Sequence, residues 1–151
     1  MRRSTPRFLR DALGPALALT ALVASGAQAQ ALAYIEASSE LDDGKPASFA
    51  YNLVDGKETT AWCAKPNAGS DTLTFGFTKM ATINEIGVVV GAVKSGAIDK
   101  RRHRAREIVV SDGRVERILP MKDSHEMQKV KLDPPAKGRM ITVEVRETYA
   151  G

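Results

Sequence analysis

The chain has 151 residues, with 22 Lys and Arg against 18 Asp and Glu, and a net charge of +4 at pH 7. Four of the basic residues and one acidic residue lie in the first 29 positions, which leaves 18 and 17 and a net charge of +1 for residues 30–151. This near balance does not favour a nucleic-acid-binding protein. Residues 30–151 are enough for one domain with an ordinary core, and no repeat or linker divides them.

The N-terminal segment has the three parts of a secretory signal peptide. Four arginines lie within residues 2–10, an apolar run occupies residues 12–24, and Ala27-Gln28-Ala29 fits the small-x-small cleavage pattern. The apolar run is shorter than a membrane-spanning helix requires. We therefore expect residues 1–29 to be removed, giving a secreted or periplasmic protein with no transmembrane segment after cleavage. An uncleaved N-terminal anchor is the alternative.

The next distinctive segment is residues 52–63, NLVDGKETTAWC. Asp55-Gly56 predicts a tight turn, because Asp bonds its own backbone and Gly adopts positive φ without steric cost. Trp62 should be buried, with a partner for its indole N–H. Cys63, the only cysteine, is expected to be a buried and inert thiol, with an intermolecular disulfide as the alternative. The Asp55 carboxylate either orders its own turn or contacts a cation or ligand.

The chain on both sides of this segment predicts short strands separated by turns. A first strand is expected at 31–36 and a helical turn at 48–53. In residues 71–78, Leu73, Phe75 and Phe77 alternate with threonines, which is the pattern of a half-buried strand. Residues 82–91 end in an apolar, β-branched run, as in a strand buried on both sides. Residues 94–106 are expected to be a polar and basic connection.

The C-terminal third continues this pattern. Residues 107–111 and 114–119 should form a hairpin around Asp112-Gly113. Further alternating strands are expected at 128–132 and 140–149, with a break at Asp133-Pro134-Pro135 between them. Seven or eight short strands with no convincing amphipathic helix predict an all-β domain, either an antiparallel β-sandwich or a jelly roll.

The order of these segments resembles the discoidin domain, also called the coagulation factor 5/8 type C or galactose-binding-like domain. The segments that carry the resemblance are ASS at 37–39, NLVDGKETTAW, LTFGF, INEIGVVVG, REIVVSDG and the final Tyr149-Ala150-Gly151. Within that superfamily, residues 34–151 are similar to the small bacterial version attached to NAD glycohydrolase-like toxins, which is regarded as a glycan-binding module. The resemblance implies a discoidin-like β-sandwich with a binding site in its loops.

The chain departs from that family pattern in two places. The family continues after the tyrosine-glycine motif with a polar loop and a last strand, whereas the sequence ends at Gly151, so we expect that strand to be missing and a sheet edge to be exposed.

The resemblance also bears on metal binding. The family often holds a structural calcium near the Asp55 turn, which makes Asp55 the predicted metal residue. Glu147 is the only nearby substitute for the family's acidic partner.

The second departure is the basic loop, which usually carries asparagines in the family. Here the loop is Lys100, Arg101, Arg102, His103 and Arg104. We predict that these residues bind the ligand, since clustered cations can contact a sulfated or phosphorylated glycan or another anionic cell-surface ligand. The alternatives are a solvated charged loop and, for Arg104, a structural role, because an arginine precedes this strand in the family.

Residues for catalysis are few. Ser124-His125-Glu126 contains the residue types of a triad, but neighbours in sequence do not give triad geometry. His103, His125 and Cys63 have no metal-ligand spacing. We therefore expect no enzyme activity and no cofactor beyond the calcium considered at Asp55.

These expectations combine into one function. The chain should be a secreted, non-catalytic module that recognises a carbohydrate or another cell-surface ligand through its loops, and it should bind no nucleic acid. The alternative is a structural or interaction domain that docks onto a protein partner and has no glycan ligand.

Overall fold

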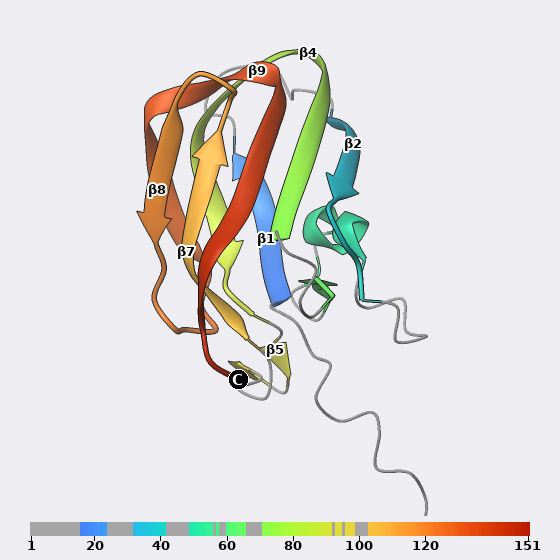
Figure 1. Cartoon of the computed structure of the whole chain (residues 1–151), viewed down its shortest axis with the longest axis vertical. Coiled ribbons are helices and arrows are strands. Elements are labelled where there is room, and N and C mark those ends of the chain that lie inside the picture. The colour runs from blue at the N-terminus through green and yellow to red at the C-terminus, as the bar shows by residue number, and fades with distance from the viewer. Residues whose placement is uncertain are drawn as a thin grey trace, which may run out of the picture.

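Antiparallel strands account for nearly all of the ordered secondary structure in the computed structural model of the chain, and the all-β prediction is confirmed (Figure 1). The structure describes residues 16–23, 32–41, 49–55, 57, 60–65, 71–91, 93–94, 96–98 and 103–151. Its elements are β1 (Ala16–Val23), β2 (Leu32–Ala37), the 3-10 helix η2 (Ala50–Val54), β3 (Trp62–Cys63), β4 (Asp71–Val89), β5 (Val93–Lys94), β6 (Ala97–Ile98), β7 (Arg104–Ser111), β8 (Glu116–Pro120) and β9 (Gln128–Tyr149).

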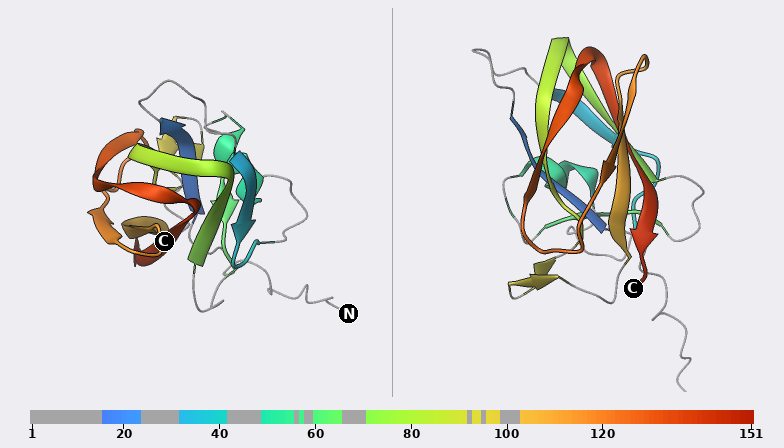
Figure 2. Two further views of the ribbon diagram at one scale, coloured as in Figure 1. Left: turned by 90° about the horizontal axis from the view of Figure 1, so that it is seen from above. Right: turned by 90° about the vertical axis from the view of Figure 1, so that its left-hand side faces the viewer.

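Two long strands, β4 and β9, connect the two layers of the sandwich. The first part of β4, residues 71–76, pairs with β2 and with residues 140–145 of β9. The second part, residues 81–88, pairs with residues 128–138 of β9. β7 and β8 extend the first layer beyond β9, and β1 and β3 extend the second layer beyond β4. Figure 2 shows the two layers facing each other across the core.

The bends that allow this arrangement lie at irregularities in the ladder. The register between β4 and β9 shifts between Gly76 and Ala81, and residues 78–80 are exposed there. The register shifts a second time between the pairs Ile83↔Ala136 and Glu85↔Lys131, so residues 132–135 of β9 form a bulge between these two pairs. Such a bulge tolerates prolines, because its residues are not needed in the ladder. Pro134 and Pro135 therefore lie within one strand, whereas the sequence predicted that they end it.

The core contains the residues that the alternation predicted. Leu73, Phe75 and Phe77 are buried, as are alternate residues of β9 and the continuous run at the end of β4; the buried set includes Ile86, Val88, Val89, Val90, Ile108, Val110, Leu132, Ile141, Val143 and Val145. Burial of these apolar side chains is the main force that favours folding.

Two segments differ from the sequence expectations. The basic connection contains a small hairpin, β5–β6, which turns at Gly96 with φ of 73°. Residues 16–23, expected within the leader, form β1 beside β4 in the structure of the whole chain. Cleavage after Ala29 stays a prediction. Among the described residues, no helix has the length and hydropathy needed to cross a membrane.

Candidate functional site

Described residues of the stretch from Asn52 to Cys63 attach it to the rest of the fold, and we call these residues the clamp. Trp62 is fully buried, and its indole N–H donates to the carbonyl of Ser39 at 2.9 Å. The buried side chain of Asn52 donates to the carbonyl of Ala61 at 3.3 Å. Cys63 is also buried. These contacts attach the loop to the segment that follows β2, so the predicted burial of Trp62 and Cys63 is confirmed.

The carboxylate of Asp55 bonds its own turn. Its Oδ1 accepts the Lys57 N–H at 2.8 Å, and its Oδ2 accepts the Thr60 hydroxyl at 2.7 Å. The Thr60 bond holds the pKa of Asp55 below its usual value; desolvation opposes this effect, and the backbone N–H and charge of Lys57 add to it. Both oxygens therefore already have partners within the turn, as expected if Asp55 orders the loop.

The surroundings of Asp55 provide little support for a calcium site. Within the described part of the chain, no group of three or more His, Cys, Asp or Glu could hold a metal ion. Glu147, the expected acidic partner, lies 3.7 Å from the guanidinium of Arg106 in an exposed ion pair. Calcium prefers six to eight oxygen ligands, so Asp55 as a calcium ligand stays a prediction.

The basic loop is described only at its C-terminal end. Lys100, Arg101 and Arg102 lie outside the described residues. His103 is exposed, with its Nδ1 3.4 Å from the hydroxyl of Thr148. These observations leave His103 as a described loop side chain that a ligand could reach.

Arg104, in contrast, is 4 % exposed and paired. Its Nε donates to Oδ1 of Asp123 at 2.7 Å and its Nη2 to Oδ2 at 3.1 Å, a bidentate arrangement that fixes the guanidinium plane. Its Cγ packs so close to Gly91 that a Cβ there would lie 2.8 Å from it. Arg104 thus connects the start of β7 to the loop after β8, which supports its structural alternative.

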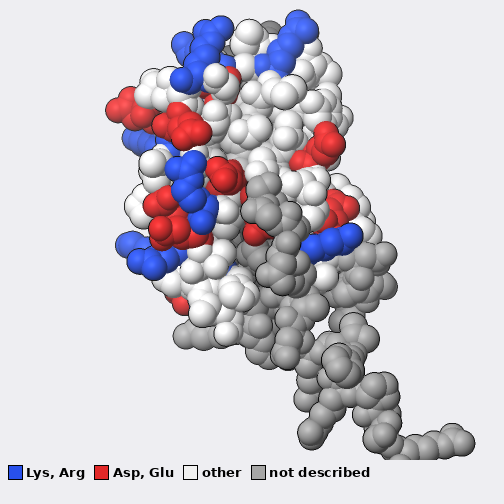
Figure 3. All heavy atoms as spheres, in the orientation of Figure 1, with Lys and Arg blue, Asp and Glu red and all other residues white. Residues whose placement is uncertain are grey.

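The exposed surface of the β7–β8–β9 side carries charges of both signs. Arg146 lies 3.3 Å from Glu144 and 3.6 Å from Glu116. Figure 3 shows basic and acidic side chains interspersed over the face seen there. In that view, the described residues form no extended positive area.

The three tyrosines differ in what their rings can contact. The Tyr149 hydroxyl donates to the carbonyl of Met121 at 2.8 Å, and the guanidinium of Arg106 lies 5.9 Å from the ring centroid. Both the polar end and the region near one face of Tyr149 therefore have partners. Tyr34 and Tyr51 remain 46 % and 58 % exposed.

Each of these exposed rings is held in place by a neighbour. A Cβ on Gly76 would overlap the ring of Tyr34, so the absence of a side chain at Gly76 allows that ring to lie on the β4 backbone. The ring of Tyr51, on η2, stacks on Phe49 with centroids 5.7 Å apart. Exposed but ordered aromatic rings are suitable for stacking on the apolar face of a ligand.

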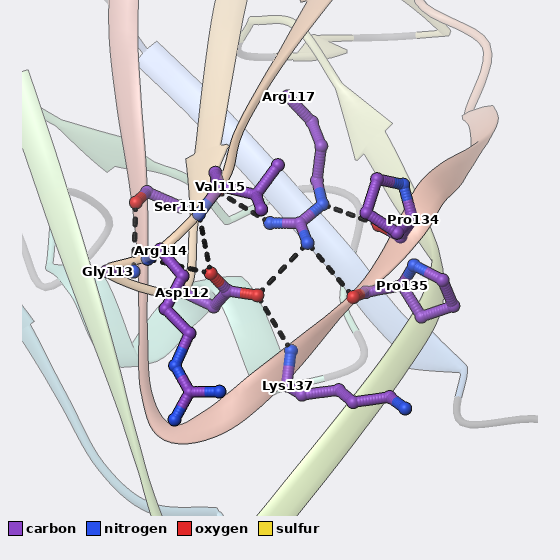
Figure 4. Close-up of polar contacts among 9 residues, drawn as sticks. All are labelled: Ser111, Asp112, Gly113, Arg114, Val115, Arg117, Pro134, Pro135 and Lys137. Carbon is purple, nitrogen blue, oxygen red and sulfur yellow. Dashed lines mark hydrogen bonds and ion pairs between the residues drawn. The ribbon is translucent and has the colours of Figure 1, made fainter.

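A buried polar cluster that the sequence did not reveal lies at the opposite end of the sandwich from the C-terminus (Figures 1 and 4). Asp112 Oδ2 accepts from Nη2 of Arg117 at 3.0 Å, and the two side chains are 5 % and 4 % exposed. The Arg117 guanidinium also donates to the carbonyls of Pro134 and Pro135 at 2.6 and 2.9 Å. The cluster therefore attaches the β7–β8 turn to the proline bulge of β9.

The Asp112 carboxylate is fully engaged in this cluster. Its Oδ1 accepts the backbone N–H groups of Arg114 and Val115, each at 3.0 Å, and Oδ2 also accepts that of Lys137 at 3.1 Å. Desolvation raises the pKa of Asp112, but these three N–H bonds and Arg117 outweigh it and hold the pKa well below its usual value. The sequence signal for a buried Arg117 was the two-residue period of strand 116–120, because it places Arg117 on the same buried face as Leu119.

Solved structures with the same fold include carbohydrate-binding modules from Clostridium perfringens. A CBM32 module of a Clostridium perfringens GH89 protein, in complex with GalNAc-β-1,3-galactose, superposes with a TM-score of 0.57 at 19 % identity over 78 % of this chain and 86 % of that one. The family 32 carbohydrate-binding module of C. perfringens NanJ, in complex with galactose, gives 0.55 at 16 % identity over 78 % and 85 %. These identities establish the fold.

Sequence comparison establishes the family. No curated protein matches the chain. The sequence pattern of the NAD glycohydrolase translocation F5/8 type C domain matches residues 27–151. The chain therefore belongs to the NAD glycohydrolase translocation F5/8 type C domain family, and the resemblance to discoidin domains and the β-sandwich prediction are confirmed.

Proposed function

We propose that the protein is an exported, non-catalytic module that binds carbohydrate. The observation that carries this proposal is the fold, which the chain shares over 78 % of its length with carbohydrate-binding modules described in complex with galactose and with a GalNAc-containing disaccharide. Membership of an F5/8 type C family supports a binding role as well. Fold similarity alone does not identify a ligand, because individual side chains make the contacts that select it.

The described residues offer the exposed rings of Tyr34 and Tyr51 and the exposed imidazole of His103 for such a site. Tyr51 lies on η2, between β2 and β3, and His103 directly precedes β7, so both belong to connections between strands. Tyr34 lies instead on the outer face of the layer formed by β2 and the first part of β4. An aromatic ring provides a flat apolar surface, and neighbouring polar groups provide orientation. We favour Tyr51 and the loop end over Tyr34.

The experiment compares ligands and variants in one assay. The exported protein, purified after processing, is applied to an array of galactose- and GalNAc-terminated glycans and of sulfated polysaccharides. Tyr51→Ala and His103→Ala should weaken binding, while Tyr34→Ala, a matched loss of an exposed tyrosine, should not. Binding that depends on Lys100, Arg101 and Arg102 should decrease with salt, because exposed charges are screened. A folded protein that binds no glycan at any salt concentration would overturn the proposal.

A further inference from the structure

β1 occupies a position in the sheet beside β4. β1 runs antiparallel to the second part of β4, and its Cα partners there are Ala18↔Val89, Leu19↔Val88, Ala21↔Gly87, Leu22↔Ile86 and Val23↔Glu85. At its other end, Ala16 and Leu17 pair with Cys63 and Trp62 of β3. β1 therefore lies along β4 in the second layer, and at its start it also pairs with β3 and, through Ala16, with the start of β7 (Figure 1).

Without β1, this part of β4 would be a sheet edge. Residues 85–88 of β4 pair with residues 128–131 of β9 on their other side, so β1 supplies the partner for the remaining edge. Backbone N–H and C=O groups at a buried edge need partners, and an unpaired edge is a template for another strand. The β4 residues at this edge include Ile86, Val88 and Val89, all at most 1 % exposed when β1 is present.

The residues of β1 also belong to the segment that the sequence identifies as a leader. The sequence of β1 is ALALTALV, which is apolar and uncharged. It lies upstream of the predicted cleavage site at Ala29, so removal of the leader would take β1 away. The same eight residues cannot be both discarded on export and retained in the sheet.

We propose that the position of β1 beside β4 is a strand-acceptor site, which takes up an apolar, uncharged strand of a partner protein once the leader has been removed. This inference rests on the predicted cleavage and is independent of the carbohydrate proposal. Recognition is β-augmentation: the backbone edge of β4 supplies hydrogen bonds, and the apolar surroundings select the side chains. β1 indicates the chemistry of the partner strand, which is about eight residues long and runs antiparallel to β4.

A second copy of the mature chain is a poorer donor. Among the described residues from 32 onward, the comparable apolar run is residues 86–90, and it is already buried in the core of its own domain. Lending it to a neighbour would open that core. A strand from a different protein carries no such penalty, so the expected partner is another protein that offers a strand similar to β1.

The test uses the full chain, in which β1 is present when the protein folds. A specific protease site is placed within residues 25–29, and the folded protein is cut there. We expect the N-terminal fragment to remain bound in native mass spectrometry and to exchange with a labelled peptide of residues 14–25. A Leu19→Pro version of the peptide should not exchange, because proline lacks the N–H and disturbs a paired strand.

Stability provides a second readout. After the fragment has been removed, the melting temperature should decrease, and the wild-type peptide, but not the Leu19→Pro peptide, should restore it. The proposal is overturned if the fragment dissociates at once and the remaining domain keeps its melting temperature and does not bind the peptide. It is also overturned if the exported protein still contains residues 16–23, since the position would then be filled from within.

Discussion

Replacing Asp112 with Asn would test whether the buried Asp112–Arg117 pair holds the β7–β8 turn against β9. The side chains of the pair are 5 % and 4 % exposed, and their polar atoms are 3.0 Å apart. In Asp112→Asn, Oδ1 can still accept the N–H groups of Arg114 and Val115. At the other oxygen, however, an uncharged amide would face two donors, Arg117 Nη2 and the N–H of Lys137.

The expected loss of stability follows from the charge that remains. Removing one partner of a buried ion pair costs about 3–5 kcal/mol. We expect about 3 kcal/mol, because Asp112→Asn keeps half of the acceptor bonds and Arg117 keeps the carbonyls of Pro134 and Pro135. For a domain of this size, that loss corresponds to a decrease in melting temperature of roughly 9–15 °C.

The assay is thermal and urea unfolding followed by the fluorescence of Trp62, which is the only tryptophan and is fully buried. Asp55→Asn is the matched control, since it changes the other Asp-Gly turn, where the carboxylate is exposed and bonds only its own loop. It should change the midpoint far less. Equal shifts for the two variants would refute the argument that burial makes Asp112 important.

The pH dependence of the stability provides an independent test of the role of Asp112. The pKa of Asp112 is depressed in the native state, so its carboxylate contributes stability above the unfolded pKa of about 3.9 and loses that contribution as the pH falls towards the native value. The stability difference between the wild-type protein and Asp112→Asn should therefore be constant from about pH 7 to 5 and decrease below about pH 4. A difference that grows on acidification would contradict the assignment.

Three further predictions concern the clamp and the outer face. Trp62→Ala should destabilise the domain by about 3–5 kcal/mol, measured by far-UV circular dichroism; an unchanged melting temperature with loss of ligand binding alone would make this stretch the site. Gly76→Ala should displace the Tyr34 ring and lower the melting temperature, and in a Tyr34→Ala background the same change should cost less. Cys63 should not react with a thiol reagent until the protein unfolds, because it is buried; rapid labelling of the native protein would disprove this.

Patterns within the chain account for much of the fold and for part of the candidate site. Alternation of apolar and polar residues places Leu73, Phe75 and Phe77 in the core, because successive side chains of a strand point to opposite faces. The composition of residues 52–63 likewise identifies a turn at Asp55 and a buried Trp62. These features depend on residues close together in the sequence, where local geometry is nearly the same in any fold.

Patterns in the sequence were thus enough to predict an all-β domain, its main inward-facing residues and its resemblance to discoidin domains. Which charges are buried and which strand edges are paired became clear only from the folded structure. Arg104 belongs to a run of basic residues, yet it is buried against Asp123, 19 positions away. Arg117 meets the carbonyl of Pro134, 17 positions away, and β1 meets β4 across more than 60 residues. Such contacts depend on how strands from distant parts of the chain come together, and no local pattern encodes that pairing.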